Sequence, residues 1–360
     1  MKYGLTYYKY TDNLGDDILS YASKRFLPQV DYYIDRESLD IFVPNETEYV
    51  ATILNGWFLH RSYAFPPSPY ILPLFIGIHF STDHIAFGDY SWLNGYVTDY
   101  LKQYEPIGCR DTNTLQAVQS RQVNSFFSGC LTMTLEPFSG VKKTNTIILT
   151  DVPIEVKTYV DSLCPGDNIM IKTHTLQEHE QNLEWYLREK RVEEYLRLYQ
   201  SAKLILTTRL HCALPAIALG TPVIIVGDYN DDFKDRIADY TKFCRLCDSK
   251  SILNGDADDF ILNSFVNEDI SFIRKELNEY CNNFISKAEI KASCSLNDLP
   301  KREQYLELYV NRTAFLRQSI EQLFNNHINL HQKYQQEHDN YMQLTELSQR
   351  LMDQYQRLLT

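Results

Sequence analysis

The sequence lacks several features that define large classes of protein. Its longest apolar run, Tyr70 to Ile78, is interrupted by Pro73 and is far shorter than the ~20 residues of a membrane-spanning helix. The first residues contain neither the apolar core nor the small-residue cleavage site of a signal peptide. We therefore expect a cytoplasmic protein without a membrane span, which works at the inner face of the membrane if its substrate is lipid-linked.

Positive charge is also scarce. The chain has 35 Lys and Arg against 47 Asp and Glu, which gives a formal net charge of -12. Phosphate neutralisation by basic residues dominates affinity for nucleic acids, so we expect no nucleic-acid partner. A small anionic substrate remains compatible with this composition, provided that a few placed Arg, Lys or His side chains meet its charge.

Cysteines and the common cofactor motifs are sparse or absent. Eight cysteines are scattered over 360 residues, too few for a disulfide framework. The pair Cys244 and Cys247 has no second C-x-x-C to complete a structural zinc site. There is no P-loop, no G-x-G-x-x-G after the first strand and no H-E-x-x-H. We predict no bound metal and no cofactor.

What the chain does contain is alternation between apolar runs of strand length and helical stretches. This alternation occurs twice, on either side of a polar break at Glu136 to Thr144. Buried strands between helices are typical of parallel sheets covered on both faces. The predicted strands cover Tyr49–Leu54, Leu72–Phe80, Ile107–Cys109, Val123–Phe127, Thr146–Leu149, Ile169–Thr173, Leu204–Thr207 and Pro222–Val226. The predicted helices cover Asp16–Phe26, 111–118, Glu155–Leu163, Asn182–Ala202 and His211–Leu219.

These elements predict an α/β fold of two doubly wound lobes that face a cleft. The first lobe covers residues 1–140, the second covers 145–268, and a helical extension covers 269–360. In the extension, Leu344, Leu351 and Leu358 recur at every seventh residue, with Leu347 on the neighbouring stripe. About two heptads are sustained, whereas a coiled coil needs three or four. The last helix therefore either packs on its own domain or forms a homo-oligomer.

Two arginines stand where a predicted strand passes into a helix. Arg110 follows Ile107 to Cys109, and Arg209 follows Leu204 to Thr207 with His211 two residues later. The N-terminus of a helix carries partial positive charge, so an arginine beside it forms an anion site. Either arginine alone is equally compatible with a solvated or salt-bridged side chain. Their recurrence in both lobes favours the anion site, with His211 as a proton donor.

Two other groups have both a structural and a functional interpretation. Asp16 and Asp17 either stabilise the start of the first helix or act as a base towards a hydroxyl group. Trp57 is either part of the core or a platform on which a sugar ring stacks, and the same holds for Tyr90 and Trp92. The sequence leaves both pairs of alternatives open.

Several segments together resemble the polysaccharide pyruvyl transferase family. In order along the chain they are Asn13-Leu14-Gly15-Asp16-Asp17, Leu54-Asn55-Gly56-Trp57, Gly77-Ile78-His79-Phe80-Ser81, Ile107-Gly108-Cys109-Arg110-Asp111, Phe127-Ser128-Gly129-Cys130-Leu131-Thr132, Thr207-Thr208-Arg209-Leu210-His211-Cys212-Ala213 and Leu219-Gly220-Thr221-Pro222-Val223. The resemblance implies two lobes like those of the GT-B glycosyltransferases, and covers residues 1–235. It also implies that pyruvate moves from phosphoenolpyruvate onto two sugar hydroxyls as a ketal.

The resemblance further implies roles for individual residues. Arg209 and His211 contact phosphoenolpyruvate in the second lobe, and Arg110 assists from the first. Lys234 is the nearest match to a lysine that contributes in relatives, although Asp231 and Asp232 depart from the family pattern. The substrate-binding set is completed by residues of the first lobe, on the acceptor side: Asn13, Asn55, Trp57 and His79.

These expectations describe a pyruvyl transferase that uses phosphoenolpyruvate as donor and a glycan or lipid-linked sugar as acceptor, in surface or capsular polysaccharide biosynthesis. Two alternatives stay open. A GT-B glycosyltransferase places the diphosphate of a nucleotide sugar at the same helix termini. A non-catalytic carbohydrate-binding or scaffolding protein assembles through the C-terminal helices.

Overall fold

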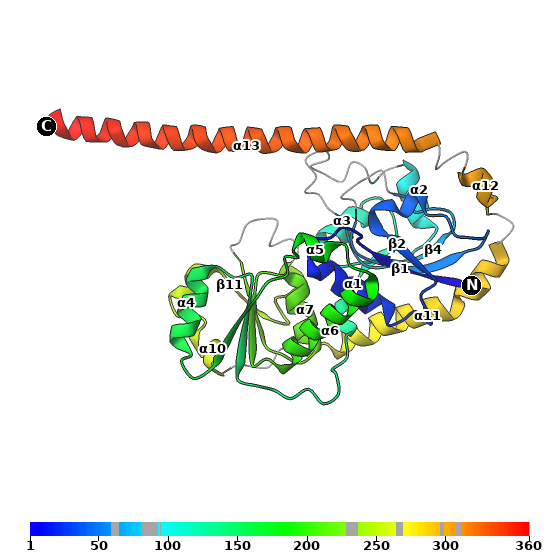
Figure 1. Ribbon diagram of the computed structural model, residues 1–360, viewed down its shortest axis with the longest axis horizontal. Coiled ribbons are helices and arrows are strands. Elements are labelled where there is room, and N and C mark those ends of the chain that lie inside the picture. Colours follow the sequence, from blue (N-terminus) through cyan, green and yellow to red (C-terminus); the bar gives the residue numbers. More distant parts are fainter. Residues whose placement is uncertain are drawn as a thin grey trace. The chain divides into compact units, whose positions relative to one another are not determined.

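The computed structural model describes residues 1–58, 65–80, 93, 95–227, 237–263, 269–295, 299–306 and 312–359. The chain divides into two compact units. The first unit, Met1–Ser81 with Leu93–Arg302, contains both sheets of Figure 1. The second comprises 82–92 and Glu303–Thr360.

The first lobe is built on a six-stranded parallel sheet. Its strands are β1 (Lys2–Tyr7), β2 (Tyr32–Asp35), β3 (Val50–Phe58), β4 (Ile71–Phe80), β5 (Ile107–Cys109) and β6 (Ser125–Phe127), in the order β2-β1-β3-β4-β5-β6. Its helices are α1 (Leu14–Lys24), α2 (Gly95–Lys102) and α3 (Thr112–Gln119), with 3-10 turns η1 (Arg36–Ile41) and η3 (Leu131–Thr134). Asp111 caps α3 by accepting a hydrogen bond from the Thr114 amide at 2.8 Å, as the sequence predicts for this helix start.

The second lobe repeats the design with five parallel strands. They are β7 (Thr146–Thr150), β8 (Asn168–Lys172), β9 (Leu204–Thr207), β10 (Val223–Val226) and β11 (Arg245–Cys247), in the order β11-β10-β9-β7-β8. The helices and turns are α4 (Ile154–Leu163), α5 (Glu178–Gln181), α6 (Trp185–Ser201), α7 (Leu210–Ala218), η4 (Ala238–Tyr240), α9 (Ser249–Leu253) and α10 (Asp258–Asn263).

Alternation along the central strands shows that both faces of this second sheet are covered. Leu204 and Leu206 of β9 belong to the cluster that includes Val156 of α4, whereas Ile205 between them belongs to the cluster that includes Leu196 of α6. Successive strand residues point to opposite faces, so continuous apolar sequence means two buried faces. The predicted α/β fold with two parallel sheets is confirmed.

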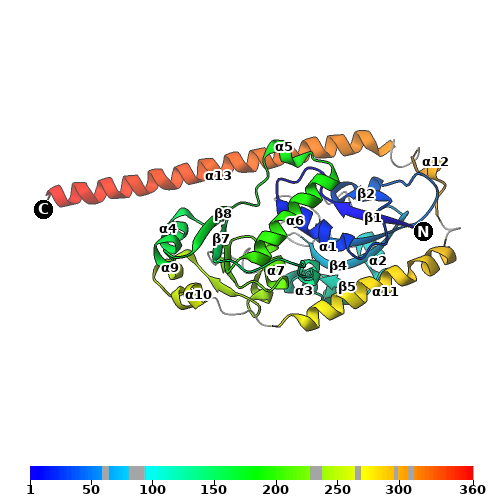
Figure 2. The ribbon, with the colours of Figure 1, turned by 60° about the horizontal axis from the view of Figure 1, so that its bottom comes forward.

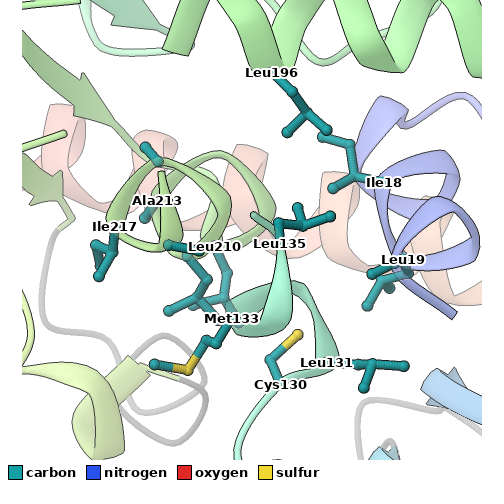
Figure 3. Packing of buried hydrophobic residues seen from close by; sticks show 14 of the residues in the cluster. Ile18, Leu19, Cys130, Leu131, Met133, Leu135, Leu196, Leu210, Ala213 and Ile217 are labelled. Atoms are coloured by element: carbon teal, nitrogen blue, oxygen red, sulfur yellow. The ribbon is translucent and has the colours of Figure 1, made fainter. Parts of the chain in front are cut away.

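One hydrophobic core crosses from lobe to lobe. In Figure 3, Ile18 of α1 lies beside Leu196 of α6, and the η3 residue Met133 lies beside Leu210 of α7. Because α1 carries apolar residues towards the second lobe, the two lobes share buried surface rather than meeting only through a linker. This packing fixes the loops that face each other between the lobes.

Both sheets have the same strand order around their first strand. The chain runs from β1 outward to β2 and then back to β3, and likewise from β7 to β8 and back to β9. In open parallel sheets, ligands bind beyond the carboxyl ends of the strands at such a switch point. The two switch points therefore mark where a site is expected in each lobe.

Helices α11 (Ser271–Ser295), α12 (Arg302–Tyr305) and α13 (Arg312–Leu359) follow the sheets. Figure 2 shows α11 along the first lobe, where it packs on β3, β4 and η3. The Arg274 guanidinium donates to the backbone oxygens of Ala218 in α7 and Leu135 after η3, at 2.6 and 3.2 Å, so α11 is fastened to both lobes. Within the ranges given above, no helix combines the length and the apolar character needed to cross a bilayer.

Candidate functional site

A pocket of about 190 Å³ lies beyond the carboxyl ends of both sheets. Its lining residues lie near the carboxyl end of β3 or follow β1, β5, β8 and β9, and they are Asn13, Trp57, Arg110, His174, Thr208, Arg209, Leu210 and His211. Drug-sized ligands occupy roughly 300–1,000 Å³. A pocket of this size suits a smaller molecule, and its wall brings together two arginines and two histidines from both lobes.

Arg110 and His211 meet directly across the lobes. Arg110 is 2% exposed, and its Nη1 lies 3.4 Å from Nε2 of His211. A guanidinium can only donate, so a hydrogen bond between these two nitrogens requires Nε2 of His211 to be the acceptor. The Nε of Arg110 is buried with no hydrogen-bond partner in the described part of the chain. Buried polar groups are nearly always hydrogen-bonded, and exceptions occur at functional sites, so this N–H is available to a ligand.

Arg209 is positioned by the start of α7 and by a carboxylate. It is the N-cap residue of α7, so it stands at the positive end of that helix. Its Nε donates to Oδ2 of Asp151 at 2.8 Å, and its Nη2 donates to Oγ1 of Thr175 at 3.2 Å. Burial alone would raise the pKa of Asp151, but hydrogen bonds from Thr173, the His174 amide and Arg209 lower it. The carboxylate therefore stays ionised and orients the guanidinium.

His174 lines the pocket and was not among the residues predicted from the sequence. It is fully buried, and its Nε2 lies 2.5 Å from the hydroxyl oxygen of Tyr199 in α6. Burial lowers the pKa of His174 to about 3, so the ring is neutral. Its Nδ1 has no hydrogen-bond partner among the described residues. The position directly after β8, at the carboxyl edge of the sheet, is the sequence signal that would have found it.

The loop after β1 joins this wall from the first lobe. Asn13 forms an antiparallel bridge with Thr175, and the Leu14 amide donates to the His174 carbonyl at 2.8 Å. The Asn13 side chain caps α1 by accepting from the Gly15 amide at 3.0 Å. A Cβ on Gly15 would lie 3.0 Å from Cβ of His211, tighter than ordinary contact. The first turn of α1 thus abuts the histidine.

Trp57 and His79 form the next layer. Trp57 lines the pocket, and its ring meets the edge of His79 with centroids 5.2 Å apart. His79 is buried, outside the lining, with Nδ1 2.6 Å from Oδ2 of Asp111. Burial alone would raise the pKa of Asp111, but the contact with His79, together with Arg110 and the Thr114 amide, lowers it. His79, held by Asp111, thus packs against the ring of Trp57.

Asn55 and Asp16, which were also predicted from the sequence, are not among the lining residues of the pocket. Asn55 is buried and donates from Nδ2 to the Leu19 carbonyl of α1 at 3.3 Å, which supports the helix. Asp16 accepts from Oγ1 of Thr11 at 2.6 Å and from Arg36 at 3.1 Å. Lys234, Tyr90 and Trp92 fall outside the described residues.

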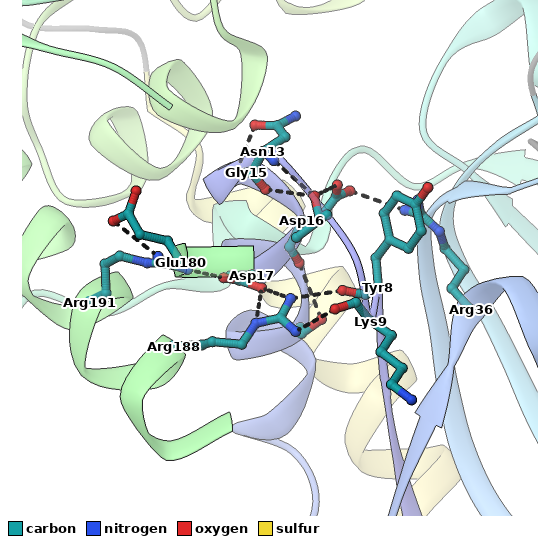
Figure 4. Close-up of polar contacts among 12 residues, drawn as sticks. Tyr8, Lys9, Asn13, Gly15, Asp16, Asp17, Arg36, Glu180, Arg188 and Arg191 are labelled. Carbon is teal, nitrogen blue, oxygen red and sulfur yellow. Dashed lines mark hydrogen bonds and ion pairs between the residues drawn. The ribbon is translucent and has the colours of Figure 1, made fainter. Parts of the chain in front are cut away.

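Asp17 lies in an ion-pair cluster between the lobes (Figure 4). Its carboxylate is fully buried and accepts from Arg188 at 2.9 Å and from Arg191 at 3.0 Å. Arg188 also donates to the Tyr8 carbonyl at 2.8 Å. Burial raises the pKa of Asp17, and the two guanidinium groups oppose that shift. The geometry ties α1 to α6, and Asp17 is not among the residues that line the pocket.

The arrangement has the chemistry of a small-anion site. Two guanidinium groups, the start of a helix and a buried neutral imidazole surround a small volume. Charge-assisted hydrogen bonds from arginine suit carboxylate and phosphate oxygens. The imidazole of His211, on the same wall, is a group that can accept and donate a proton.

Comparison with known proteins gives one family. Residues 13–229, more than half of the chain, match the polysaccharide pyruvyl transferase family. No curated protein matches significantly. Among solved structures, one match is a "functional uncharacterized protein", KP1_0663, from Klebsiella pneumoniae subsp. pneumoniae NTUH-K2044. It shares 13% identity and a TM-score of 0.39 over 68% of this chain and 91% of that chain, values that support no conclusion on fold or function. The family match contains every described lining residue of the pocket, and the chain belongs to the polysaccharide pyruvyl transferase family.

Proposed function

We propose that this protein transfers pyruvate from phosphoenolpyruvate to two hydroxyls of a sugar as a ketal. Family membership supports a transferase that acts on polysaccharide. The observation that carries the donor assignment is the pocket of about 190 Å³ in which Arg110 meets His211 while Arg209 stands at the start of α7. Phosphoenolpyruvate is a small molecule with a carboxylate and a phosphate, and this wall offers a cation for each.

The energetics need no metal and no further cofactor. Hydrogen bonds to charged groups contribute about 1.5–3 kcal/mol each. Three such bonds, from Arg110, Arg209 and a ring N–H, give roughly 5–9 kcal/mol before the entropic costs of binding. Micromolar to millimolar dissociation constants correspond to only about 4–8 kcal/mol.

His174 completes the proposed donor site. In a neutral imidazole one nitrogen donates and the other accepts. When the Tyr199 hydroxyl donates to Nε2, the ring proton is on Nδ1, and this is the tautomer that offers an N–H to an anion. Burial raises the pKa of Tyr199 well above its usual value, so its hydroxyl keeps the proton that it donates.

The proposed chemistry begins with protonation of the methylene carbon by His211. This leaves positive character on the neighbouring carbon, and a sugar hydroxyl attacks there while losing its proton. The bond to phosphate then breaks, and the second hydroxyl attacks the same carbon and closes the ring. Of the two hydroxyl protons released, one replaces the proton that His211 donated and the other leaves with the phosphate. Phosphate binding by the arginines assists its departure.

The two carboxylates predicted as bases receive different proposed roles. Asp17 is enclosed by Arg188 and Arg191, so we assign it to the contact between the lobes. Asp16 has 15% of its side chain exposed and remains the candidate base for a sugar hydroxyl. Trp57, at the pocket wall, is the candidate platform for the acceptor ring.

We further propose that the lobes are arranged as in GT-B enzymes, with the acceptor on the first lobe and phosphoenolpyruvate on the second. The product belongs to surface or capsular polysaccharide biosynthesis in the cytoplasm, at the inner face of the membrane if the acceptor is lipid-linked. A nucleotide sugar, the alternative donor, is larger than phosphoenolpyruvate and fits a pocket of this volume poorly.

A phosphate-release assay tests the proposal. Phosphoenolpyruvate is offered with galactose-, mannose- and N-acetylmannosamine-containing acceptors, including lipid-linked ones. We expect acceptor-dependent release that is lost in Arg209→Ala and kept in Lys157→Ala, which removes a half-buried cation of α4 in the same lobe, away from the pocket lining. Calorimetry with phosphoenolpyruvate and with nucleotide diphosphates separates the donors. Binding of nucleotide diphosphates without phosphoenolpyruvate would overturn the assignment.

A further inference from the structure

Leucine recurs every seventh residue along nearly all of α13, not only near its end. The sequence carries leucine at 316, 323, 330, 344, 351 and 358, with Glu337 at the position between 330 and 344. Counting past this one interruption extends the repeat from two heptads to six. The second row of a heptad lies three positions before the first, and it carries Ile320, Tyr334 and Tyr341, with the polar residues His327 and Ser348 in the same row. Six heptads exceed the three or four that define a coiled coil.

The described side chains of this seam are exposed. Leu323, Leu330 and Leu344 are 69%, 67% and 65% exposed, and Tyr334 and Tyr341 are 64% and 67% exposed. All five stand on α13, a helix of 48 residues. A seam of large apolar side chains on one long helix marks an interaction surface, because isolated hydrophobic residues scatter instead of repeating.

A helix of this length exceeds what its own protein can cover. At 1.5 Å per residue, 48 residues extend for roughly 70 Å. A compact unit of about 290 residues has a radius of gyration near 19 Å and thus a diameter of roughly 50 Å. Covering the full seam therefore requires a partner that is itself long and straight.

We propose that α13 pairs with α13 of a second copy of this chain as a parallel, in-register coiled coil. A seven-residue repeat matches a partner helix with the same repeat, and an identical helix in register places leucine on leucine and tyrosine on tyrosine. Burying six leucines and two tyrosines removes on the order of 800 Å² from each helix, about what each partner contributes to a standard stable interface.

Glu337 is the one charged residue in the leucine row of the seam. A single polar residue in a coiled-coil core lowers stability and restricts register. In register, Glu337 faces its own counterpart, so it weakens the pairing more than any other residue of the repeat. Replacing Glu337 with an apolar residue should therefore strengthen the association of the two helices.

Sedimentation of the full-length protein tests the seam. We expect the wild type to be oligomeric at micromolar concentration and Leu330→Glu/Leu344→Glu to be monomeric. The matched control Gln336→Glu/Gln343→Glu adds the same charge one position before Glu337 and before Leu344, off the seam, and should stay oligomeric. A wild type that is monomeric at these concentrations, or a seam variant that keeps its oligomeric state, would overturn the proposal.

A variant that strengthens association shows that the loss of oligomers in the seam variant is not caused by unfolding. Glu337→Leu should lower the dissociation constant of the oligomer by about tenfold or more, because it removes facing like charges and adds apolar seam. Asp339→Leu, two residues away on the outer face, should leave that constant unchanged. Equal effects of the two substitutions would show that added apolarity, not the seam, drives association.

Cross-linking tests orientation. Leu323→Cys should give a reducible covalent dimer, because in parallel register the two introduced thiols face each other. Gln332→Cys, on the outer face, should not. A covalent dimer in neither variant, while sedimentation shows an oligomer, would exclude the parallel register. Phosphoenolpyruvate binding should be the same in every α13 variant, so the outcome is independent of whether the proposed transfer reaction is correct.

Discussion

Two arginines of this molecule are buried to the same extent in opposite surroundings. Arg110 and Arg188 are each 2% exposed, and each contacts the other lobe. Arg188 directs its Nε and Nη2 to the carboxylate of Asp17 and its Nη2 also to the Tyr8 carbonyl. Arg110 contacts the ring of His211, and its Nε has no hydrogen-bond partner in the described residues.

The difference is between an arginine whose Nε and Nη2 groups are satisfied within the fold and an arginine with a buried N–H that no described residue accepts. Burying a guanidinium is unfavourable unless its N–H groups are satisfied, so a saturated arginine contributes to the fold. An arginine kept buried with an unsatisfied N–H beside a pocket destabilises the empty protein and favours an anion that completes it. The exposed fraction of a buried arginine therefore does not distinguish the two cases, whereas its hydrogen-bond partners do.

The largest expected effect concerns the saturated arginine. Arg188→Met leaves the buried Asp17 with Arg191 as its remaining cation, and should lower the free energy of unfolding by about 3–5 kcal/mol. Urea unfolding measures this. Lys190→Met removes an exposed cation from the same helix and should change stability by less than about 0.5 kcal/mol.

A second variant sharpens this result. Adding Asp17→Asn to Arg188→Met removes the uncompensated carboxylate and should restore part of the lost stability. If the double variant were as unstable as the sum of the two single variants, the cluster would not act as an ion pair.

Arg110→Met should show the opposite pattern. Removal of a buried, incompletely paired guanidinium should leave the free energy of unfolding unchanged or raise it. Phosphoenolpyruvate should bind with about 1.5–3 kcal/mol less free energy, a ~10–150-fold higher Kd by calorimetry. Lys102→Met, at an exposed position of the same lobe, serves as control for the loss of one positive charge. If Arg110→Met lost much stability but bound phosphoenolpyruvate as the wild type does, Arg110 would be a structural arginine like Arg188.

The sequence alone predicts where Arg110 lies in the fold. It does not predict that Arg110 and Arg188 differ in their hydrogen-bond partners. Arg110 and Arg209 stand between a buried strand and a helix start, and this local pattern places both at the carboxyl edge of a parallel sheet. Arg188 lies inside a helix, and its partner Asp17 is 171 residues away, a pairing set by the packing of α1 on α6. For that reason the sequence suggests a base at Asp17 where the fold forms an ion pair.

The same reasoning explains which elements the sequence predicted. The strands β5 and β9 are continuous apolar runs, and their predicted bounds agree with the structure. The strands β1 and β2 carry half-buried tyrosines, so they lack a clear apolar pattern. His174 stands after β8, whose exposed and half-buried residues reveal little of the sheet edge that the histidine occupies.

The third prediction concerns His174, whose buried ring should make the protein acid-labile. Its pKa is about 3 in the fold, so below the unfolded value of about 6.5 the unfolded chain binds a proton that the folded chain does not. This contribution to stability is complete above pH 6.5 and is lost progressively as the pH falls towards 3. His174 should remove about 2 kcal/mol between pH 7 and pH 5.

Unfolding of wild type and His174→Asn across this range measures the difference. The variant should lack this part of the pH dependence, while the remaining groups contribute equally to both proteins. Parallel profiles would show that the ring is not held neutral. Tyr199→Phe, which removes the hydroxyl partner, should weaken phosphoenolpyruvate binding by less than Arg110→Met does, since a neutral donor is weaker than a charged one.

The smallest expected effect lies at Gly15, where α1 abuts the pocket. A methyl group there would stand 3.0 Å from Cβ and 3.2 Å from Nδ1 of His211, so the ring must shift by a few tenths of an ångström. The pocket gives the ring room to move, and alanine is a better helix former than glycine, so the free energy of unfolding should be unchanged or higher. Displacement of His211, the proposed acid, should reduce kcat/KM by about fivefold, or ~1 kcal/mol. Gly166→Ala, where an added Cβ meets open space, should leave both quantities unchanged. A Gly15→Ala protein with full activity would mean that the position of His211 tolerates this shift, and would remove the reason to treat the start of α1 as part of the site.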